Sequence, residues 1–227
     1  MTGLAGNFIG GWLARLVPLN RLMAISQFVL MTGLLALPHV HTVAMAMAWA
    51  TLMGLGAYPG QGDNWLGMLG MHGTYEANMA MHDCDVMVNI GARFDDRITG
   101  RLNAFSPHSK KIHIDIDPSQ INKVVHVDVP ILGDVGRVLK ALIAEIKAAK
   151  KQPEAAALKD WWAQITKWRA RNSLAYAPNK DVIMPQYAIQ RLYEKTKHHD
   201  TYITTEVGQH QMWAAQFYHF DKPNRWM

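Results

Sequence analysis

The feature that most constrains the fold is the apolar run Val86–Ile90, which ends on Gly91 and leads into a charged loop. A short run of this kind is typical of a strand that is buried on both faces of a parallel sheet. Open α/β sheets bind their ligands at the carboxyl ends of such strands. We therefore expect an α/β fold with a ligand site where this strand ends.

Strands and helices alternate along the chain after residue 58. Runs of apolar and β-branched residues predict strands, and apolar residues at a period near 3.6 predict helices. The alternation favours a doubly wound parallel sheet. The predicted strands are 84–90, 111–117, 129–132 and 201–205, and the predicted helices are 73–82, 134–150, 158–171, 185–197 and 211–217.

The first 58 residues differ in character from the rest of the chain. Their only charged residues are Arg15 and Arg21, and all 18 acidic residues come later. Of the apolar runs 4–13, 22–37 and 43–58, the later two approach the roughly 17 to 25 residues of a membrane-spanning helix. Two interpretations stay open. The segment is similar to a piece of a major-facilitator transporter, although the loop motif at 10–15 lacks its usual acidic residue, or it forms buried helices of a soluble fold.

Overall charge and cysteine content exclude some classes of protein. The formal net charge is +5, yet lysine and arginine are dispersed and form no basic stripe with interleaved aromatic residues, so we expect no nucleic-acid partner. Cys84 is the only cysteine, which excludes an internal disulfide and a cysteine-rich zinc site. A reducing, cytoplasmic compartment is the simplest inference.

The loop after Gly91 is the first candidate site. It carries two guanidiniums, of Arg93 and Arg97, and two carboxylates, of Asp95 and Asp96. Such a group can hold a phosphate or diphosphate. It can equally form internal ion pairs on a solvated surface, and the spacing alone leaves both interpretations open.

The predicted strand 111–117 is the second candidate. Strict alternation places His113, Asp115 and Asp117 on one side. These side chains could ligate a divalent metal, although three successive positions of one strand rarely converge. Alternatively, Asp115 lies at the distance from the glycine-ended strand where nucleotide-binding domains hold ribose hydroxyls. The third interpretation is a polar strand end without a ligand.

Glycine-containing segments supply further candidates. The segments 51–60 and 69–73 combine glycine with methionine, which allows close approach of the backbone to a flat ligand or simply a methionine-rich core. The turn Val207-Gly208-Gln209-His210 follows a predicted strand and precedes a predicted helix. A strand, a glycine turn and a helix N-terminus together form an anion site.

These motifs together resemble the catalytic large subunit of acetohydroxyacid synthase, also called acetolactate synthase. The family consists of thiamine-diphosphate enzymes of branched-chain amino acid synthesis. The similarity runs from about Ala50 to Met227 and includes several motifs in the same order. The matching segments are 51–59, 69–78, 91–100, 112–118, 133–134 and 206–216.

The resemblance implies two cofactor regions. The middle domain of the family binds FAD in a structural rather than redox role, and the third domain binds thiamine diphosphate. The residues that match the flavin contacts are Thr51, Leu52, Met53, Met71, His72, Gly91, Arg93, Asp95, Arg97, Asp115, Ile116, Gly133 and Asp134. Those that match the contacts with the thiamine diphosphate are Val207, Gly208, Gln209 and His210, and no residue is expected to be catalytic or to bind a metal.

The resemblance also implies a reaction and partners. Pyruvate loses carbon dioxide on thiamine diphosphate, and the product adds to a second 2-oxo acid. The family forms homo-oligomers and binds a small regulatory subunit. It also needs a first-domain glutamate and a Gly-Asp-Gly…Asn segment that holds Mg²⁺, and this sequence contains neither. We therefore expect a fragment that is inactive alone.

Four parts are predicted along the chain. They are an apolar helical segment at 1–50, a partial FAD-binding domain at 51–150, a linker at 151–182 and the start of a thiamine-diphosphate domain at 183–227. Membrane contact, if it occurs, is expected through the first part. The alternative function is therefore a membrane-anchored, noncatalytic flavin-binding module.

Overall fold

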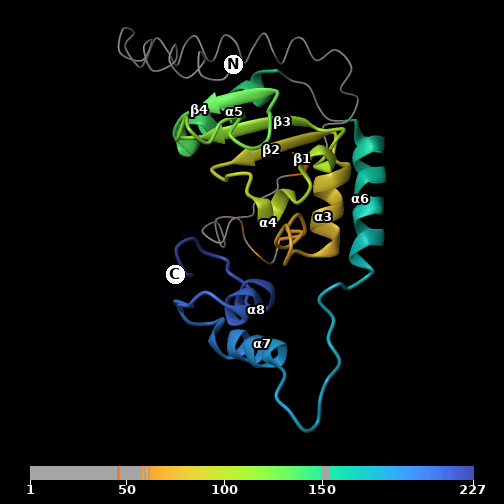
Figure 1. Ribbon diagram of the computed structural model, residues 1–227, viewed down its shortest axis with the longest axis vertical. Helices are drawn as coiled ribbons and strands as arrows, with labels where there is room; N and C mark the ends of the chain where they lie inside the picture. Colours follow the sequence, from red (N-terminus) through yellow and green to blue (C-terminus); the bar gives the residue numbers. More distant parts are fainter. Residues whose placement is uncertain (1–44, 47–57, 59, 61, 150–153) are drawn as a thin grey trace. The chain divides into compact units, whose positions relative to one another are not determined.

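The computed structural model describes residues 45–46, 58, 60, 62–149 and 154–227, all within one compact unit of the chain, 41–227. Strands and helices alternate in its first part, and helices predominate after β4 (Figure 1). The elements are β1 (Met45–Ala46), α3 (Tyr75–Asp83), β2 (Val86–Ile90), α4 (Asp96–Thr99), the 3₁₀ helix Leu102–Ala104, β3 (Lys110–Asp115), β4 (Val129–Leu132), α5 (Val135–Ala148), α6 (Ala155–Arg169), α7 (Pro185–Thr196) and α8 (Gln209–Phe217).

The described strands form one parallel sheet of order β1-β2-β3-β4 (Figure 1). This confirms the predicted α/β class with a parallel sheet. Two residues that we expected in an apolar helical segment, Met45 and Ala46, instead form β1 and pair with Val86 and Met87. A short apolar run satisfies a helix and a buried strand equally well, so periodicity alone does not separate them.

Strand β2 forms the centre of the core. All five of its residues are buried, as expected for a strand that is covered on both faces. Helix α3 packs beside it and is capped at its N-terminus by Thr74, whose hydroxyl accepts the N–H of Ala77. The core cluster consists of Met81, Cys84, Met87, Phe94, Phe105 and Val127.

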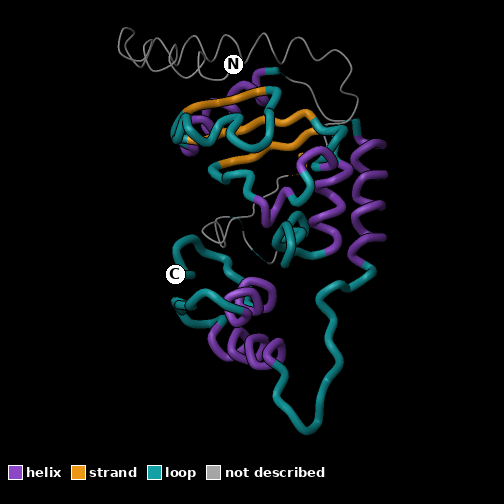
Figure 2. The backbone as a smooth tube through the Cα atoms, viewed as in Figure 1, coloured by secondary structure: helices purple, strands orange, loops and turns teal. Residues whose placement is uncertain are grey.

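Helix α6 packs against α3, as Figure 2 shows. Its contact residues Ile165 and Trp168 are buried together with Ala80 of α3. Trp161 meets Trp168 edge to face, with ring centroids 5.7 Å apart. The region that we assigned to a linker, 151–182, therefore contains a helix that belongs to a core, and the four domain boundaries remain predictions.

The C-terminal residues pack around α7 and α8. Tyr218 and Phe220 are buried there, and the Tyr193 ring lies 5.3 Å from that of Tyr218. The predicted strand 201–205 is wrong, because the structure contains only an isolated bridge between Ile203 and Trp226. Its β-branched residues are suited to a strand, but its backbone bonds with 225–227 form this single bridge and no ladder.

The apolar N-terminal segment cannot be compared with the structure, because residues 1–44 lie outside the described part of the chain. Within the part that is described, no helix combines the length and apolar character needed to cross a bilayer.

Candidate functional site

Two glycines meet the end of β3 at the carboxyl edge of the sheet. Gly91, which follows β2, donates its N–H to the carbonyl of Ile114 over 2.8 Å. Gly133, which follows β4, donates to the carbonyl of Asp115 over 2.9 Å. Gly91 has a φ of +61°, in the left-handed region that favours glycine. Three of the predicted site residues, one from each strand end, are thus brought together.

The loop after Gly91 is anchored by one aromatic side chain. Phe94 is buried, and its ring meets Phe105 at 5.8 Å and His113 at 5.2 Å, both edge to face. Such aromatic pairs stabilise a specific geometry beyond the area they bury. Phe94 therefore fixes the loop on the sheet, while Arg93 beside it is left exposed.

The charges of this loop form one weak ion pair and a helix cap. The Nε of Arg93 lies 3.4 Å from a carboxylate oxygen of Asp95, and the Arg93 side chain is 71% exposed. The same Asp95 caps α4 by accepting the N–H of Arg97 at 3.1 Å. An exposed pair of this kind contributes little to stability, so the Arg93 guanidinium remains accessible to an anionic ligand.

A second turn lies beside this loop. The N–H of Met71 donates to the carbonyl of Arg97 over 2.8 Å. Gly70 makes the approach possible, since a Cβ there would lie 2.4 Å from the same carbonyl oxygen. The side-chain amide of Asn78 forms two hydrogen bonds with Gly70, 2.8 and 2.9 Å long, and thereby holds the turn on α3. Met71 and His72 are consequently exposed next to the charged loop.

Asp115 is a buried carboxylate with a local role in the structure. One oxygen accepts the N–H of Asp117 at 2.9 Å, and the other lies 3.5 Å from Nε2 of His113. His113 is fully buried and donates from Nε2 to the carbonyl of Ala92 at 3.1 Å. Burial lowers the pKa of His113, despite the nearby Asp115 carboxylate, and thereby favours the neutral imidazole.

The metal-site interpretation of the segment 111–117 is wrong. Strand β3 ends at Asp115, and Asp117 lies in the following turn, where its carboxylate accepts the N–H and the hydroxyl of Ser119. The described residues include no group of three histidine, cysteine or acidic side chains that could hold a metal ion. Alternation along the sequence did not indicate where the strand would end.

The edge also exposes apolar side chains. Ile116, directly after β3, is 69% exposed, and Leu132, at the end of β4, is 51% exposed. Large apolar side chains exposed together often mark a ligand or protein contact. Two residues after Leu132, Asp134 caps α5 by accepting the N–H of Arg137 at 3.0 Å, so its carboxylate already serves the helix.

The predicted thiamine-diphosphate turn lies at the N-terminus of α8. Val207 is 87% exposed, and Gly208 caps the helix without a side-chain hydrogen bond. Gln209 and His210 are exposed in the first turn. An N-terminus without a side-chain cap leaves backbone N–H groups and a positive partial charge available to an anion.

Some site residues were not predicted, and others cannot be located. Thr51, Leu52 and Met53 lie outside the described residues. The sequence argument missed Asn78 and Asn89, whose side chains hold Gly70 and the carbonyl of Ala92. A signal for Asn89 was present, because an amide inside a buried apolar strand needs a hydrogen-bond partner.

Comparison with known proteins agrees with this geometry. Residues 39–142 match the family model described as "Thiamine pyrophosphate enzyme, central domain". This similarity covers slightly less than half of the chain and assigns the segment 39–142 to the central domains of thiamine pyrophosphate enzymes. The acetolactate synthase isozyme 3 large subunit of Escherichia coli K12 is 49% identical over 177 residues, which are 78% of this chain and 31% of that protein.

Other relatives agree with this assignment. The acetolactate synthase large subunit of Buchnera aphidicola subsp. Schizaphis graminum is 50% identical over 177 residues, 78% of this chain and 30% of that protein. The acetolactate synthase of Mycobacterium bovis is 44% identical over 178 residues, with coverages of 78% and 28%. The resemblance predicted from the sequence is confirmed, and the chain spans about a third of the length of these relatives.

Proposed function

We propose that this chain supplies the FAD-binding region of an acetolactate synthase large subunit. The observation that carries the proposal is the meeting of Gly91 and Gly133 at the end of β3, next to the Asp115 carboxylate. A parallel sheet whose strand ends carry glycines and one acidic side chain is suited to a dinucleotide. The 49% identity to an acetolactate synthase large subunit favours this enzyme within the family.

The residues of this edge have the chemistry that FAD requires. The Asp115 carboxylate, whose two oxygens together have about four lone-pair sites, can accept ribose hydroxyls in addition to its internal bonds. Arg93 offers an exposed guanidinium for the diphosphate. Ile116 and Met71, 69% and 62% exposed, offer apolar surface to a flat ring. Together with these four, the residues proposed for FAD are Thr51, Leu52, Met53, His72, Gly91, Asp95, Arg97, Gly133 and Asp134.

Thiamine diphosphate is proposed to bind at the turn Val207, Gly208, Gln209 and His210. When bound, this cofactor would supply the electron sink for decarboxylation of a 2-oxo acid and its joining to a second one. The residues of this chain would hold the diphosphate through the N-terminus of α8, where N–H groups and the helix dipole favour negative charge. Mg²⁺ is proposed for the enzyme, and no described residue of this chain is assigned to it.

The proposed partners follow from the relatives. Their printed name, large subunit, supports a smaller partner subunit, and we propose a homo-oligomer with small-molecule 2-oxo acid substrates in the cytoplasm. No observation on the described residues favours the membrane-anchored alternative.

Titration of the purified chain with FAD tests the proposal. Quenching of flavin fluorescence should report binding, and Asp115→Asn should weaken it about tenfold or more, because a hydrogen bond to a charged group contributes about 1.5 to 3 kcal/mol. Asp117→Asn is the matched control, since its carboxylate bonds only within its own turn. The proposal fails if the unmodified chain does not bind FAD, or if both variants weaken binding equally.

A further inference from the structure

We propose that Gln216 is a positioning residue that couples flavin binding to helix α8, the helix proposed to hold thiamine diphosphate. The inference rests on the proposed function and adds a physical connection between its two cofactor regions. It is carried by a series of hydrogen bonds that joins the loop after β2, the 70–72 turn and α8.

The first step joins the loop to the turn. The carbonyl of Arg97 in α4 accepts the N–H of Met71 over 2.8 Å. Gly70 packs so closely against Arg97 that a side chain there would collide with the same carbonyl. The turn is held from its other side by the Asn78 amide. The turn and α4 therefore form one rigid contact, and a ligand that orders one of them orders the other.

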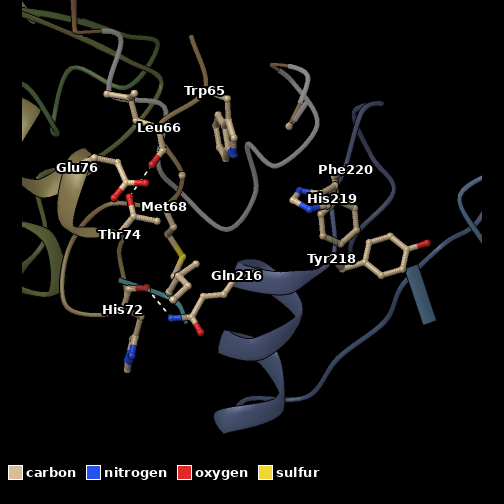
Figure 3. A pocket seen from close by; sticks show the side chains of 14 residues that line it. Trp65, Leu66, Met68, His72, Thr74, Glu76, Gln216, Tyr218, His219 and Phe220 are labelled. Carbon is tan, nitrogen blue, oxygen red and sulfur yellow. Dashed lines mark hydrogen bonds between the residues drawn. The ribbon is translucent and has the colours of Figure 1, made fainter. Parts of the chain in front are cut away.

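The second step joins the turn to α8. Nε2 of Gln216 donates to the carbonyl of His72 over 2.8 Å, across 144 positions of sequence, as the dashed line in Figure 3 shows. Gln216 lies in the last turn of α8 between the buried residues Ala214 and Phe217. Because Ala214 and Phe217 are buried on the same helical turn, the backbone of Gln216 is held in place and its amide acts on the turn directly.

The bond from Gln216 to His72 lies beside a pocket that both residues line. The pocket has a volume of about 180 Å³ and is lined by the residues around Trp65 and Glu76 on one side and by Tyr218 and Phe220 on the other (Figure 3). Side chains therefore do not fill the space beside this bond. A hydrogen bond from Gly60 to Phe220 and the packing of Trp65 against the Tyr218 and Phe220 cluster also join the two sides of the pocket, but neither contacts the 70–72 turn.

The expected consequence is coupling between the two cofactor regions. Met71 and His72 are proposed flavin contacts, so bound FAD would restrict the motion of the His72 carbonyl. An acceptor that moves less holds the Gln216 amide better, and α8 then opens less often. One hydrogen bond contributes about 1 kcal/mol net, so the effect should be about fivefold on the opening equilibrium of α8.

Hydrogen exchange with FAD as the probe tests this coupling. In the unmodified chain, FAD should slow exchange of the α8 amides about fivefold. Gln216→Leu, which keeps the size and removes the donor, should still bind FAD but lose the slowing, and Gln216→Glu should do the same. Gln211→Leu is the control, because its side chain makes no hydrogen bond among the residues that the structure describes.

The possible outcomes distinguish failure of the coupling from failure of the proposed FAD site. Failure of the unmodified chain to quench flavin fluorescence overturns both. If FAD binds but does not slow exchange in α8, or if Gln216→Leu retains the slowing, the coupling is overturned and the flavin site stands. If Gln216→Leu loses structure in general, its amides will exchange faster even without FAD. In that case the Gln216→Glu variant is used to decide whether the coupling is lost.

Discussion

Nε2 of His113 donates to the carbonyl oxygen of Ala92 over 3.1 Å, beneath the loop that follows β2. The same oxygen accepts a second bond, of 2.6 Å, from the amide of Asn89. The base of the candidate flavin loop is thus held by two buried polar side chains. The other ring nitrogen of His113, Nδ1, is buried without a hydrogen-bond partner among the described residues, so the neutral tautomer fits and the cation does not.

The stability of the chain should therefore fall on mild acidification. Burial lowers the pKa of His113 from its ordinary value of 6.5, so below about pH 6.5 the unfolded chain binds a proton that the folded chain resists. The free energy of unfolding should decrease as the pH falls from 7.5 towards 5. Urea unfolding across this range should show a shallower decrease for His113→Asn than for the unmodified chain. A slope for His113→Asn equal to that of the unmodified chain would contradict this expectation.

Gly70 and Gly100 should respond differently to the same substitution. Both have positive φ angles, +84° and +53°, a backbone conformation that L side chains rarely adopt. A Cβ at Gly70 would also lie 2.4 Å from the carbonyl of Arg97, whereas nothing lies within 4 Å at Gly100. We expect Gly70→Ala to cost about 3 kcal/mol or more in urea unfolding and Gly100→Ala only the conformational part. Equal costs would show that the turn shifts freely.

The sequence predicted the sheet because its strands have strong local patterns. The bounds expected for β4, 129–132, are those observed, and β2 lies within the expected 84–90. Parallel strands place their carboxyl ends at one edge, so the approach of Gly91, Asp115 and Gly133 also followed from the order of elements. The sequence did not predict α4, because a helix of four residues that begins at the Asp95 cap has no periodicity to detect.

The contacts that hold the site were harder to predict. Asn78 and Gln216 both act through their side chains on main-chain groups, at separations of 8 and 144 residues. Bonds of this kind depend on how loops and helices meet in space, and no spacing rule marks them. The failed strand at 201–205 has a related cause, since a strand depends on its pairing with another segment as well as on its own residues.

Helix α6 should contribute substantially to stability, although the sequence predicted a linker where the helix begins. Ile165 is 1% exposed against α3, and its replacement by alanine should cost about 2 to 5 kcal/mol through lost contacts and a cavity. Ile146 of α5 is 49% exposed, and the same substitution there should cost only about 0.5 kcal/mol. The two costs are compared by measuring the denaturant concentration at the midpoint of unfolding for each variant. If Ile165→Ala behaves like Ile146→Ala, α6 does not pack against α3 in solution.

Cys84 should be unreactive in the folded chain. Its side chain is fully buried, its Sγ donates to the carbonyl of Met81 at 3.3 Å, and burial raises the pKa of the thiol. Because the thiolate is the reactive form, a chromogenic disulfide reagent at pH 8 should react about a hundredfold more slowly in buffer than in urea. Ala156→Cys in a Cys84→Ala background gives an exposed thiol on α6 as a control and should react at similar rates in both. Rapid reaction of Cys84 in buffer would mean that the core between α3 and β2 opens far more often than its burial implies.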